Sequence, residues 1–350
     1  MWIFRSQDVE KLRIKGKVKG LIKLLEDDDD EVRASAAEAL GDFDDLEVIN
    51  ALLKTLKDKN REVRWRAAKS LEYLCKEKPE ILIHAFAHSN SVLQKVSLAW
   101  LLGRIGDKRA IPALAEALRF GDKYVRRASI ISMGRIRDET TIPHLINALK
   151  DYDADVRKRA AEALGRIRIK RDDVVKALVN SLFDEDRGVR RAAAKSLERL
   201  GWEPESDEEL AAYLAALRMG SELMLLGEVA VEPLIIALQD ADWSVKKWAS
   251  EVLGEIKSDK VLKRLVEVLD TDDWAVKVHA LKALSKMGKD GIAFIARFLD
   301  DPDPGVRETA VDAFRDCLKE CEPEERKRVI EELIETYPSI KERIKDIKLV

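Results

Sequence analysis

Positively charged and aromatic side chains recur at fixed places along the middle of this chain. Counted from the first residue of a repeated motif, they stand at positions −1, +2, +3, +6 and +10. The residues are Trp65, Arg66, Lys69, Trp100, Arg104, Tyr124, Arg127, Arg135, Lys158, Arg159, Arg166, Arg191, Lys195, Arg199 and Trp248. Arg and Lys bind carboxylates and phosphates, while Trp and Tyr add flat contact area at low entropic cost. We therefore predict that these side chains form a binding surface for an acidic ligand.

The distribution of charge along the chain agrees with this prediction. Residues 61–200 contain 30 Lys and Arg against 19 Asp and Glu, a net charge of +11. Residues 201–350 contain 22 Lys and Arg against 33 Asp and Glu, a net charge of −11. The overall charge of −3 therefore conceals two regions of opposite sign. In the basic region, the acids at the positions given above are Glu62, Asp155 and Glu162. The alternative is a solvated surface on which each Arg pairs with a neighbouring acid.

Histidine residues form no constellation that predicts a catalytic or metal site. His84 and His88 are one helical turn apart, but no third ligand stands near them in the sequence. His279 stands alone at a position expected to face solvent, so we predict a surface histidine. Glycine-rich phosphate loops, nucleophile elbows and Cys–His pairs are absent from the sequence. We therefore predict a protein that is not an enzyme and needs no cofactor or metal.

The cysteines are too few and too unevenly spaced for a disulfide framework. Cys317 and Cys321 stand at i and i+4, where they share a helix face, and Cys75 stands alone. We predict that all three behave as small buried hydrophobic residues.

The motif that sets these positions has the form V-R-x-x-A-A-x-A-L-G. It begins at Val32, Val63, Val125, Val156, Val189, Val245, Val276 and Val306, with a degenerate copy from Gln94. The usual step is 31 residues, and a short fixed period is typical of stacked supersecondary units that bury their apolar faces against each other. Such a stack presents extended surfaces, which favours a binding function.

Each repeat is expected to contain two helices. The first is apolar with Pro near its start, as in residues 110–119 and 141–150. The second carries the motif and follows an N-cap three residues before its first position, at Asp29, Asn60, Ser91, Asp122, Asp153, Asp186, Asp242, Asp273 and Asp303. Helical spacing places Val156, Ala160, Leu164 and Ile167 on one buried face. The Arg after the motif Val recurs in most copies, so we expect a ladder of Arg bound to Asp-rich turns rather than one catalytic Arg.

This combination of period, Pro, Asp and Val-Arg resembles the HEAT-like repeat family, particularly its phycobilisome-lyase type, over residues 20–320. The resemblance implies an all-α, right-handed α-solenoid of about nine repeats plus one variant unit, with the motif helices on the concave side. It also implies a binding scaffold. HEAT-like repeats also build deoxyhypusine hydroxylase, but its iron site needs His-Glu pairs, and here no His is followed by Glu.

We expect one continuous solenoid with five segments. They are an N-terminal cap in residues 1–26, repeats with the basic concave face in 27–200, a variant repeat in 201–228, acidic repeats in 229–320, and C-terminal cap helices in 321–350. In the variant repeat, Ser206 and Glu209 form a capping box that predicts a helix over 207–217, and a shorter apolar segment follows at 221–226. The caps are predicted as helices within 8–26, 324–337 and 340–349.

No apolar run is long enough to span a membrane, and the apolar start of the chain is too short for a signal peptide, so we expect a cytoplasmic protein without membrane partners. Charged residues make up 37% of the chain, a bias that resembles proteins from thermophiles.

The sequence favours a noncatalytic protein–protein interaction scaffold whose concave face binds an acidic segment of a protein partner. The alternative is nucleic-acid binding, with Arg and Lys on phosphates and aromatic rings on bases. HEAT-like DNA glycosylases are a subcase of that alternative, with Asp155 or Glu162 as the carboxylate, although the regular period departs from that family. Because phosphate binding weakens steeply with salt, salt dependence separates the two functions.

Overall fold

The computed structural model describes the backbone of residues 2–346 and the side chains of residues 8–341, 343 and 344. Within these residues the regular structure is entirely helical, as predicted. The last part of the predicted C-terminal cap, residues 347–350, lies outside the described residues. The chain divides into two compact units, Met1–Ala177 with Lys195–Leu200, and Leu178–Ala194 with Gly201–Val350.

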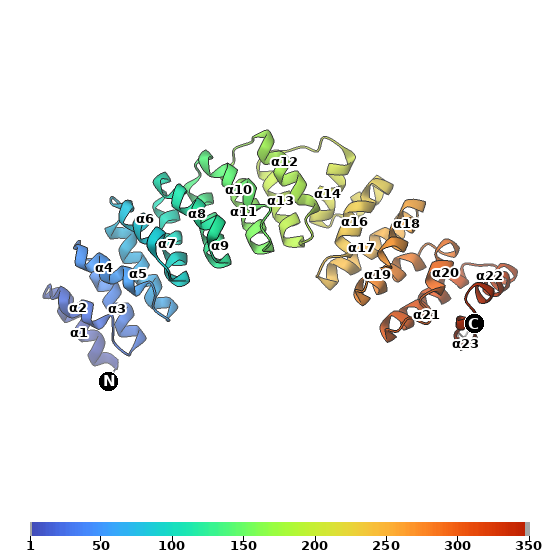
Figure 1. Cartoon of the computed structure of the whole chain (residues 1–350), viewed down its shortest axis with the longest axis horizontal. Helices are drawn as coiled ribbons and strands as arrows, with labels where there is room; N and C mark the ends of the chain where they lie inside the picture. Colours follow the sequence, from blue (N-terminus) through green and yellow to red (C-terminus); the bar gives the residue numbers. More distant parts are fainter. Residues whose placement is uncertain (1, 347–350) are drawn as a thin grey trace. The chain divides into compact units, whose positions relative to one another are not determined.

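The first unit consists of helix pairs that stack in chain order (Figure 1, blue to green). Its helices are α1 (Trp2–Ile14), α2 (Val18–Leu24), α3 (Asp30–Leu40), α4 (Leu46–Thr55), α5 (Arg61–Leu74), α6 (Pro79–His88), α7 (Val92–Ile105), η1 (Lys108–Ala110), α8 (Ile111–Phe120), α9 (Lys123–Ile136), η2 (Glu139–Thr141), α10 (Ile142–Ala148) and α11 (Ala154–Ile167). The motif helices α3, α5, α7, α9 and α11 pack against one another in sequence. They form one continuous layer of this unit.

Two helices are divided between the units, namely α12 (Asp172–Asn180) and α13 (Arg187–Arg199). The other elements of the second unit are η3 (Ser181–Phe183), α14 (Asp207–Leu217), α15 (Gly220–Leu226), η4 (Gly227–Ala230), α16 (Val231–Leu238), α17 (Trp243–Ile256), α18 (Asp259–Val268), α19 (Trp274–Ser285), α20 (Lys289–Ala296), α21 (Pro304–Lys319), α22 (Pro323–Thr336), η5 (Pro338–Ile340) and α23 (Lys341–Asp346). Here the motif helices α17, α19 and α21 pack together in the same way.

The predicted N-caps start the motif helices. In α11, for example, the Asp153 carboxylate accepts the backbone N–H of Val156 at 3.1 Å, and in α5 the Asn60 side chain accepts that of Glu62 at 2.7 Å. The same side-chain capping is present at Asp29, Ser91, Asp122, Asp186, Asp242, Asp273 and Asp303. Each cap contributes about 1 kcal/mol and fixes where the motif helix begins.

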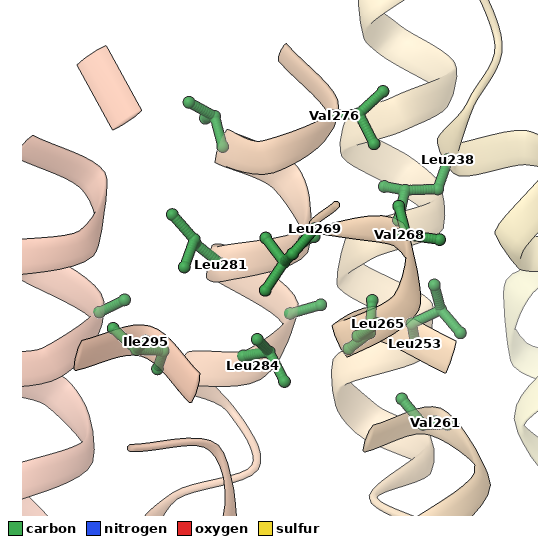
Figure 2. Packing of buried hydrophobic residues seen from close by; sticks show 14 of the residues in the cluster. Leu238, Leu253, Val261, Leu265, Val268, Leu269, Val276, Leu281, Leu284 and Ile295 are labelled. Atoms are coloured by element: carbon green, nitrogen blue, oxygen red, sulfur yellow. The ribbon is translucent and has the colours of Figure 1, made fainter. Parts of the chain in front are cut away.

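Apolar residues of both helices in each repeat fill the space between neighbouring repeats. In α11, Val156, Ala160, Leu164 and Ile167 are all buried, as predicted. Figure 2 shows the corresponding core of the second unit, where Val268 and Leu269 at the end of α18 lie among Leu238, Leu253 and Leu281. Because neighbouring repeats within each unit bury such a layer against each other, the hydrophobic effect stabilises the stack of each unit.

The Arg that follows the motif Val binds the turn before its own helix. The Nη1 atom of Arg33 donates to the backbone carbonyl of Asp27 at 2.8 Å, and that of Arg157 donates to the carbonyl of Asp151 at 2.9 Å. Arg64, Arg126, Arg190 and Arg307 make the equivalent bonds. Each Arg therefore stabilises the turn that connects the two helices of its repeat.

Most of these Arg and Lys side chains also bind an Asp of the following repeat. Arg126 makes two bonds of 2.8 Å to the carboxylate of Asp151, and Arg190 makes one of 2.7 Å to Asp240. Related pairs join Arg33 to Asp58, Lys246 to Asp273 and Lys277 to Asp301. The predicted ladder between Arg and Asp-rich turns is confirmed.

The motif helices approach closely where a small residue faces a serine of the next motif helix. The Ser132 hydroxyl on α9 donates to the backbone carbonyl of Ala99 on α7 at 2.6 Å. A Cβ on Gly103 of α7 would lie 2.7 Å from the Cα of Ser132, which leaves no room for a methyl group. Ser70 and Ser196 make equivalent bonds to Ala37 and Ala161.

Gly103→Ala is therefore expected to destabilise the first unit by about 1–3 kcal/mol, although Ala favours helices more than Gly. The measurement is urea denaturation followed by circular dichroism. Ser97→Ala, on the same helix but partly exposed, serves as the control and should change stability by less than about 0.5 kcal/mol. Equal stability of Gly103→Ala and the wild type would show that α7 and α9 can move apart without cost.

The irregular segment has the predicted helices, but its capping box and the start of the first helix differ from the predictions. The helix over Asp207–Leu217 has the predicted bounds, and Ser206 accepts the N–H of Glu209 at 3.2 Å. The second half of the capping box differs, because Glu209 accepts the N–H of Glu205 instead of that of Ser206. The helix predicted over 221–226 is α15. At the N-terminus, α1 begins at Trp2, earlier than the predicted start at residue 8.

Candidate binding surface of the motif helices

The predicted binding residues are all exposed or half-buried in the structure. Those of the first unit stand on α5, α7, α9 and α11 and at the end of α13, whereas Arg191 and Trp248 belong to the second unit. Trp65 and Tyr124 are 48% and 52% exposed, and Trp100 is half-buried. Large aromatic side chains at this exposure are consistent with a contact surface.

An apolar groove lies between α5 and α7. Its volume is about 280 Å³, and its walls are formed by Trp65, Ala68, Leu93, Val96, Ser97 and Trp100, with Arg61 and Arg64 at its edge. Leu93 is 45% exposed, and the Lys69 ammonium lies 5.4 Å from the centre of the Trp65 ring. The groove has the size and polarity to take a single bulky apolar side chain.

A group of cations surrounds Trp100 beside this groove. The guanidinium carbons of Arg104 and Arg135 lie 5.0 and 6.0 Å from the centre of the Trp100 ring, within range of cation–π attraction. Burial, followed by the charges of Arg166 and Arg104, lowers the pKa of Arg135. Because these three Arg repel one another, an anion bound among them would relieve the repulsion. We call Trp100, Arg104, Arg135 and Arg166 the Trp100 cluster.

Other cations of the predicted set are already neutralised. Arg66 binds three carboxylates, those of Glu62 at 2.9 Å, Glu38 at 3.0 Å and Glu31 at 3.3 Å. Two of these acids stand on α3, one repeat away, so the sequence positions of the basic set did not reveal them. Arg66 is therefore a poor candidate for holding a ligand anion.

The remaining acids of the set pair in the same way. Arg127 contacts Asp155 at 3.3 Å, and Arg159 contacts Glu162 at 2.8 Å. Arg104 of the Trp100 cluster contacts Glu72 at 2.8 Å. Thus the solvated-surface alternative describes part of the predicted set.

The cations that keep their charge uncompensated are a smaller group. Among the described residues, no carboxylate lies within ion-pair distance of Lys69, Arg135, Lys158, Arg166, Lys195 or Arg199. Arg135, Arg166 and Arg199 occupy the same position, +10, in successive motif helices. The structure therefore brings together an apolar groove and a row of unpaired cations on the motif helices of the first unit.

Sequence models of HEAT repeats match residues 18–98, 79–151, 142–218 and 231–335. The chain belongs to the HEAT repeat family. The predicted resemblance is confirmed at this level. HEAT repeat solenoids are typically protein-interaction scaffolds, and the fold is generally non-catalytic. No curated protein sequence matches the chain.

Solved structures similar to this HEAT repeat protein include an engineered protein, with 24% identity, a TM-score of 0.35, and coverage of 89% of this chain and 91% of the other. Another is human deoxyhypusine hydroxylase in complex with glycerol, with 22% identity and a TM-score of 0.32. The match covers 78% of this chain and 97% of the hydroxylase. A third is the complex of CpcE and CpcF of phycocyanin lyase from Nostoc sp. PCC7120, with 21% identity and a TM-score of 0.35. The match covers 71% of this chain and 92% of the matched chain. With identities below 25% and TM-scores below 0.5, the similarity to these structures assigns no function to this chain.

In this HEAT repeat protein, His279 is buried, which differs from the sequence-based prediction. His279 was predicted at the surface, but it is 1% exposed. The ring of Trp243, from the preceding motif helix, packs edge-on against it with ring centres 4.4 Å apart. The prediction was wrong because helical position alone does not report a bulky neighbour from another repeat. His84 and His88 are exposed and stack on each other at 4.1 Å.

The cysteines are buried thiols, as predicted. Burial raises the pKa of Cys75 to about 11 and that of Cys317 to about 12, so both stay protonated at neutral pH. Cys321 is also buried. Within the described part of the chain, no group of three or more His, Cys, Asp and Glu side chains is arranged to hold a metal ion. Nor does any described helix have the length and apolar character needed to cross a membrane.

In the second unit, Trp248 lies half-buried beneath the guanidinium of Arg218, with 5.4 Å between the guanidinium carbon and the ring centre. Arg191 is exposed on the part of α13 that belongs to this unit.

Proposed function

We propose that this HEAT repeat protein is a noncatalytic scaffold that binds an acidic segment of a protein partner on the motif helices of its first unit. The Trp100 cluster carries the proposal. It combines the Trp100 ring, flanked by the guanidinium groups of Arg104 and Arg135, with the nearby Arg166. Arg135 and Arg166 have no carboxylate partner among the described residues. Uncompensated cations that are partly desolvated gain most from a charge-assisted bond.

The apolar groove indicates what else the partner carries. Trp65 and Trp100 line the groove, and Trp100 also belongs to the cation cluster, so apolar and ionic contacts are contiguous. A peptide with one bulky apolar residue followed by acidic residues matches both features. Buried aromatic and Arg side chains are the residue types that dominate protein–protein binding energy.

The pairing of the other cations favours such a peptide over a nucleic acid. Arg66, Arg127 and Arg159 are held by carboxylates of the protein, so the motif helices carry a mosaic of charge rather than a uniform basic track. A phosphate backbone gains from continuous positive potential, whereas a short acidic segment needs only a few cations. Asp155 and Glu162, the carboxylates of the glycosylase subcase, are among those paired groups.

The test uses fluorescence anisotropy with a short labelled peptide that has one Leu followed by Glu and Asp residues. Arg135→Glu with Arg166→Glu should weaken binding about 100-fold or more, since two charge-assisted bonds of about 1.5–3 kcal/mol each are lost. The matched control, Arg119→Glu with Lys150→Glu, changes the net charge equally at exposed residues near the ends of α8 and α10 and should leave binding unchanged.

A labelled oligonucleotide of the same net charge is titrated in parallel at two salt concentrations. Tighter binding of the oligonucleotide, with a steep loss at high salt, would replace the proposal by the nucleic-acid alternative. Equal peptide affinity for the cluster variant and the control variant would overturn the assignment of the binding surface.

A further inference from the structure

The second unit contains a pocket that the proposed function does not use. It has a volume of about 700 Å³, within the range of small-molecule sites, and lies between the motif helices α17 and α19. Its lining residues are Met224, Trp243, Lys247, Ser250, Glu251, Val252, Glu255, His279, Lys282, Ser285 and Lys286. All of them belong to the second unit, so this pocket is independent of the Trp100 cluster.

A buried histidine in the pocket wall lacks one hydrogen bond. The Ser250 hydroxyl donates to the backbone carbonyl of Lys247 at 2.8 Å, so its oxygen is left to accept from Nδ1–H of His279, 3.5 Å away. In this tautomer Nε2 carries a lone pair, and it has no partner among the described residues. Burial, then the charges of Lys282, Lys246 and Lys247, lowers the pKa of His279 to about 4, so the imidazole is neutral at pH 7.

Aromatic surface adjoins this histidine. The ring of Trp243 lies 4.4 Å from that of His279 and 5.7 Å from that of Trp274, measured between ring centres. Trp243 is the first residue of α17 and is 46% exposed, and Trp274 is the first residue of α19 and is 50% exposed. Nε2 is covered in this structure and the Trp243 ring packs on the imidazole, so a ligand that bonds to Nε2 requires this half-exposed ring to turn aside.

The charges of the pocket leave one cation free. Lys286 pairs with Glu255 at 2.8 Å, and Lys247 lies 4.0 Å from Glu251. Lys282 is exposed, and no carboxylate among the described residues lies within ion-pair distance of it. Lys282 stands three residues after His279 on α19, so the two side chains lie about one helical turn apart on the same side of the helix. The pocket therefore carries a net positive charge beside aromatic surface.

We propose that this pocket binds a flat aromatic group that carries an N–H or O–H donor and a negative charge. The ring stacks on Trp243, the donor bonds to Nε2 of His279, and the anion pairs with the ammonium of Lys282. Two sources offer this chemistry, namely a free aromatic acid and a Trp or Tyr next to an acidic residue in a peptide.

The full chain is titrated by calorimetry with indole-3-acetate and, separately, with a capped Trp-Glu dipeptide. Binding of the free acid alone identifies a small-molecule site, and tighter binding of the dipeptide identifies a peptide site. His279→Phe keeps a ring of similar shape but removes the acceptor, and should weaken binding about tenfold. Lys282→Gln should weaken it about fivefold, while Lys263→Gln on α18, outside the pocket, serves as the control.

A second readout is the ¹⁵N chemical shift of the His279 ring nitrogens, which moves when Nε2 accepts a hydrogen bond. It is measured in the wild type and in Lys282→Gln, a surface change that leaves the core intact. Absence of binding by both probes at millimolar concentration overturns the proposal. So does binding that is unchanged in both His279→Phe and Lys282→Gln.

Discussion

Replacing Arg126 by Met is expected to lower the free energy of unfolding of the first unit by about 3–5 kcal/mol. Arg126 is 5% exposed and makes two 2.8 Å bonds to Asp151 and one of 3.0 Å to the carbonyl of Gly121. Its guanidinium also lies 4.5 Å from the centre of the Tyr152 ring. Met keeps the apolar stem but leaves the largely buried Asp151 carboxylate without its counter-charge.

The chain supplies a matched control at the same motif position. Among the described residues, Arg64 bonds only to the carbonyls of Asp58 and Lys59 in its own turn, and it is half-buried. Arg64→Met should therefore cost about 1 kcal/mol. Urea denaturation by circular dichroism, with hydrogen exchange across α9 and α10, measures both variants.

A double variant, Arg126→Met with Asp151→Leu, identifies the cause of the loss. If the unpaired carboxylate is responsible, replacing both partners by apolar residues should recover most of the stability. Equal costs for Arg126→Met and Arg64→Met would contradict the importance of the bond between repeats.

Stability of the second unit is expected to fall by about 2–3 kcal/mol as the pH is lowered from 6.5 to 4, because of His279 alone. Its pKa in the folded protein is lowered from 6.5 to about 4, mainly by burial. The unfolded chain therefore takes up a proton first, so the contribution is fully present above pH 6.5 and is lost as the pH approaches 4. Solvent screening keeps the value below that of the full shift.

The measurement compares urea midpoints at several pH values for the wild type and His279→Phe. Carboxylates titrate in both proteins, so the difference between their two curves isolates the histidine. The Phe variant should lose less stability on acidification. Parallel curves for the two proteins would show that His279 has the same pKa in the folded and unfolded states, and would contradict the prediction.

Much of the architecture follows from local patterns that the sequence contains in full. An Asp or Asn that caps a helix acts on backbone N–H groups two or three residues away, so Asp153 and Asn60 could be assigned without knowledge of the fold. The Arg ladder was also predictable, because a fixed period brings equivalent residues of adjacent repeats into the same contact. The helix over Asp207–Leu217 was found from its cap alone.

The binding surface was predictable only in outline. Position within the motif identified side chains that are not buried, but it gave all of the basic residues equal weight. The structure separates Arg66, which binds three carboxylates, from Arg135, which binds none among the described residues and is affected by two neighbouring Arg. The apolar groove between Trp65 and Trp100 was also missed, because only charged and aromatic residues were selected at the motif positions, and Leu93 and Val96 at −1 and +2 are aliphatic.

By itself, the sequence determined the helical repeats, their caps, their buried faces and the family, because each depends on spacing within about one repeat. Tertiary structure alone decided which charges remain uncompensated and which polar groups are buried. Those outcomes depend on side chains from neighbouring motif helices, such as Glu38 against Arg66 and Trp243 against His279. Their rotamers and reach, rather than their positions in the motif, set the electrostatics of the surface.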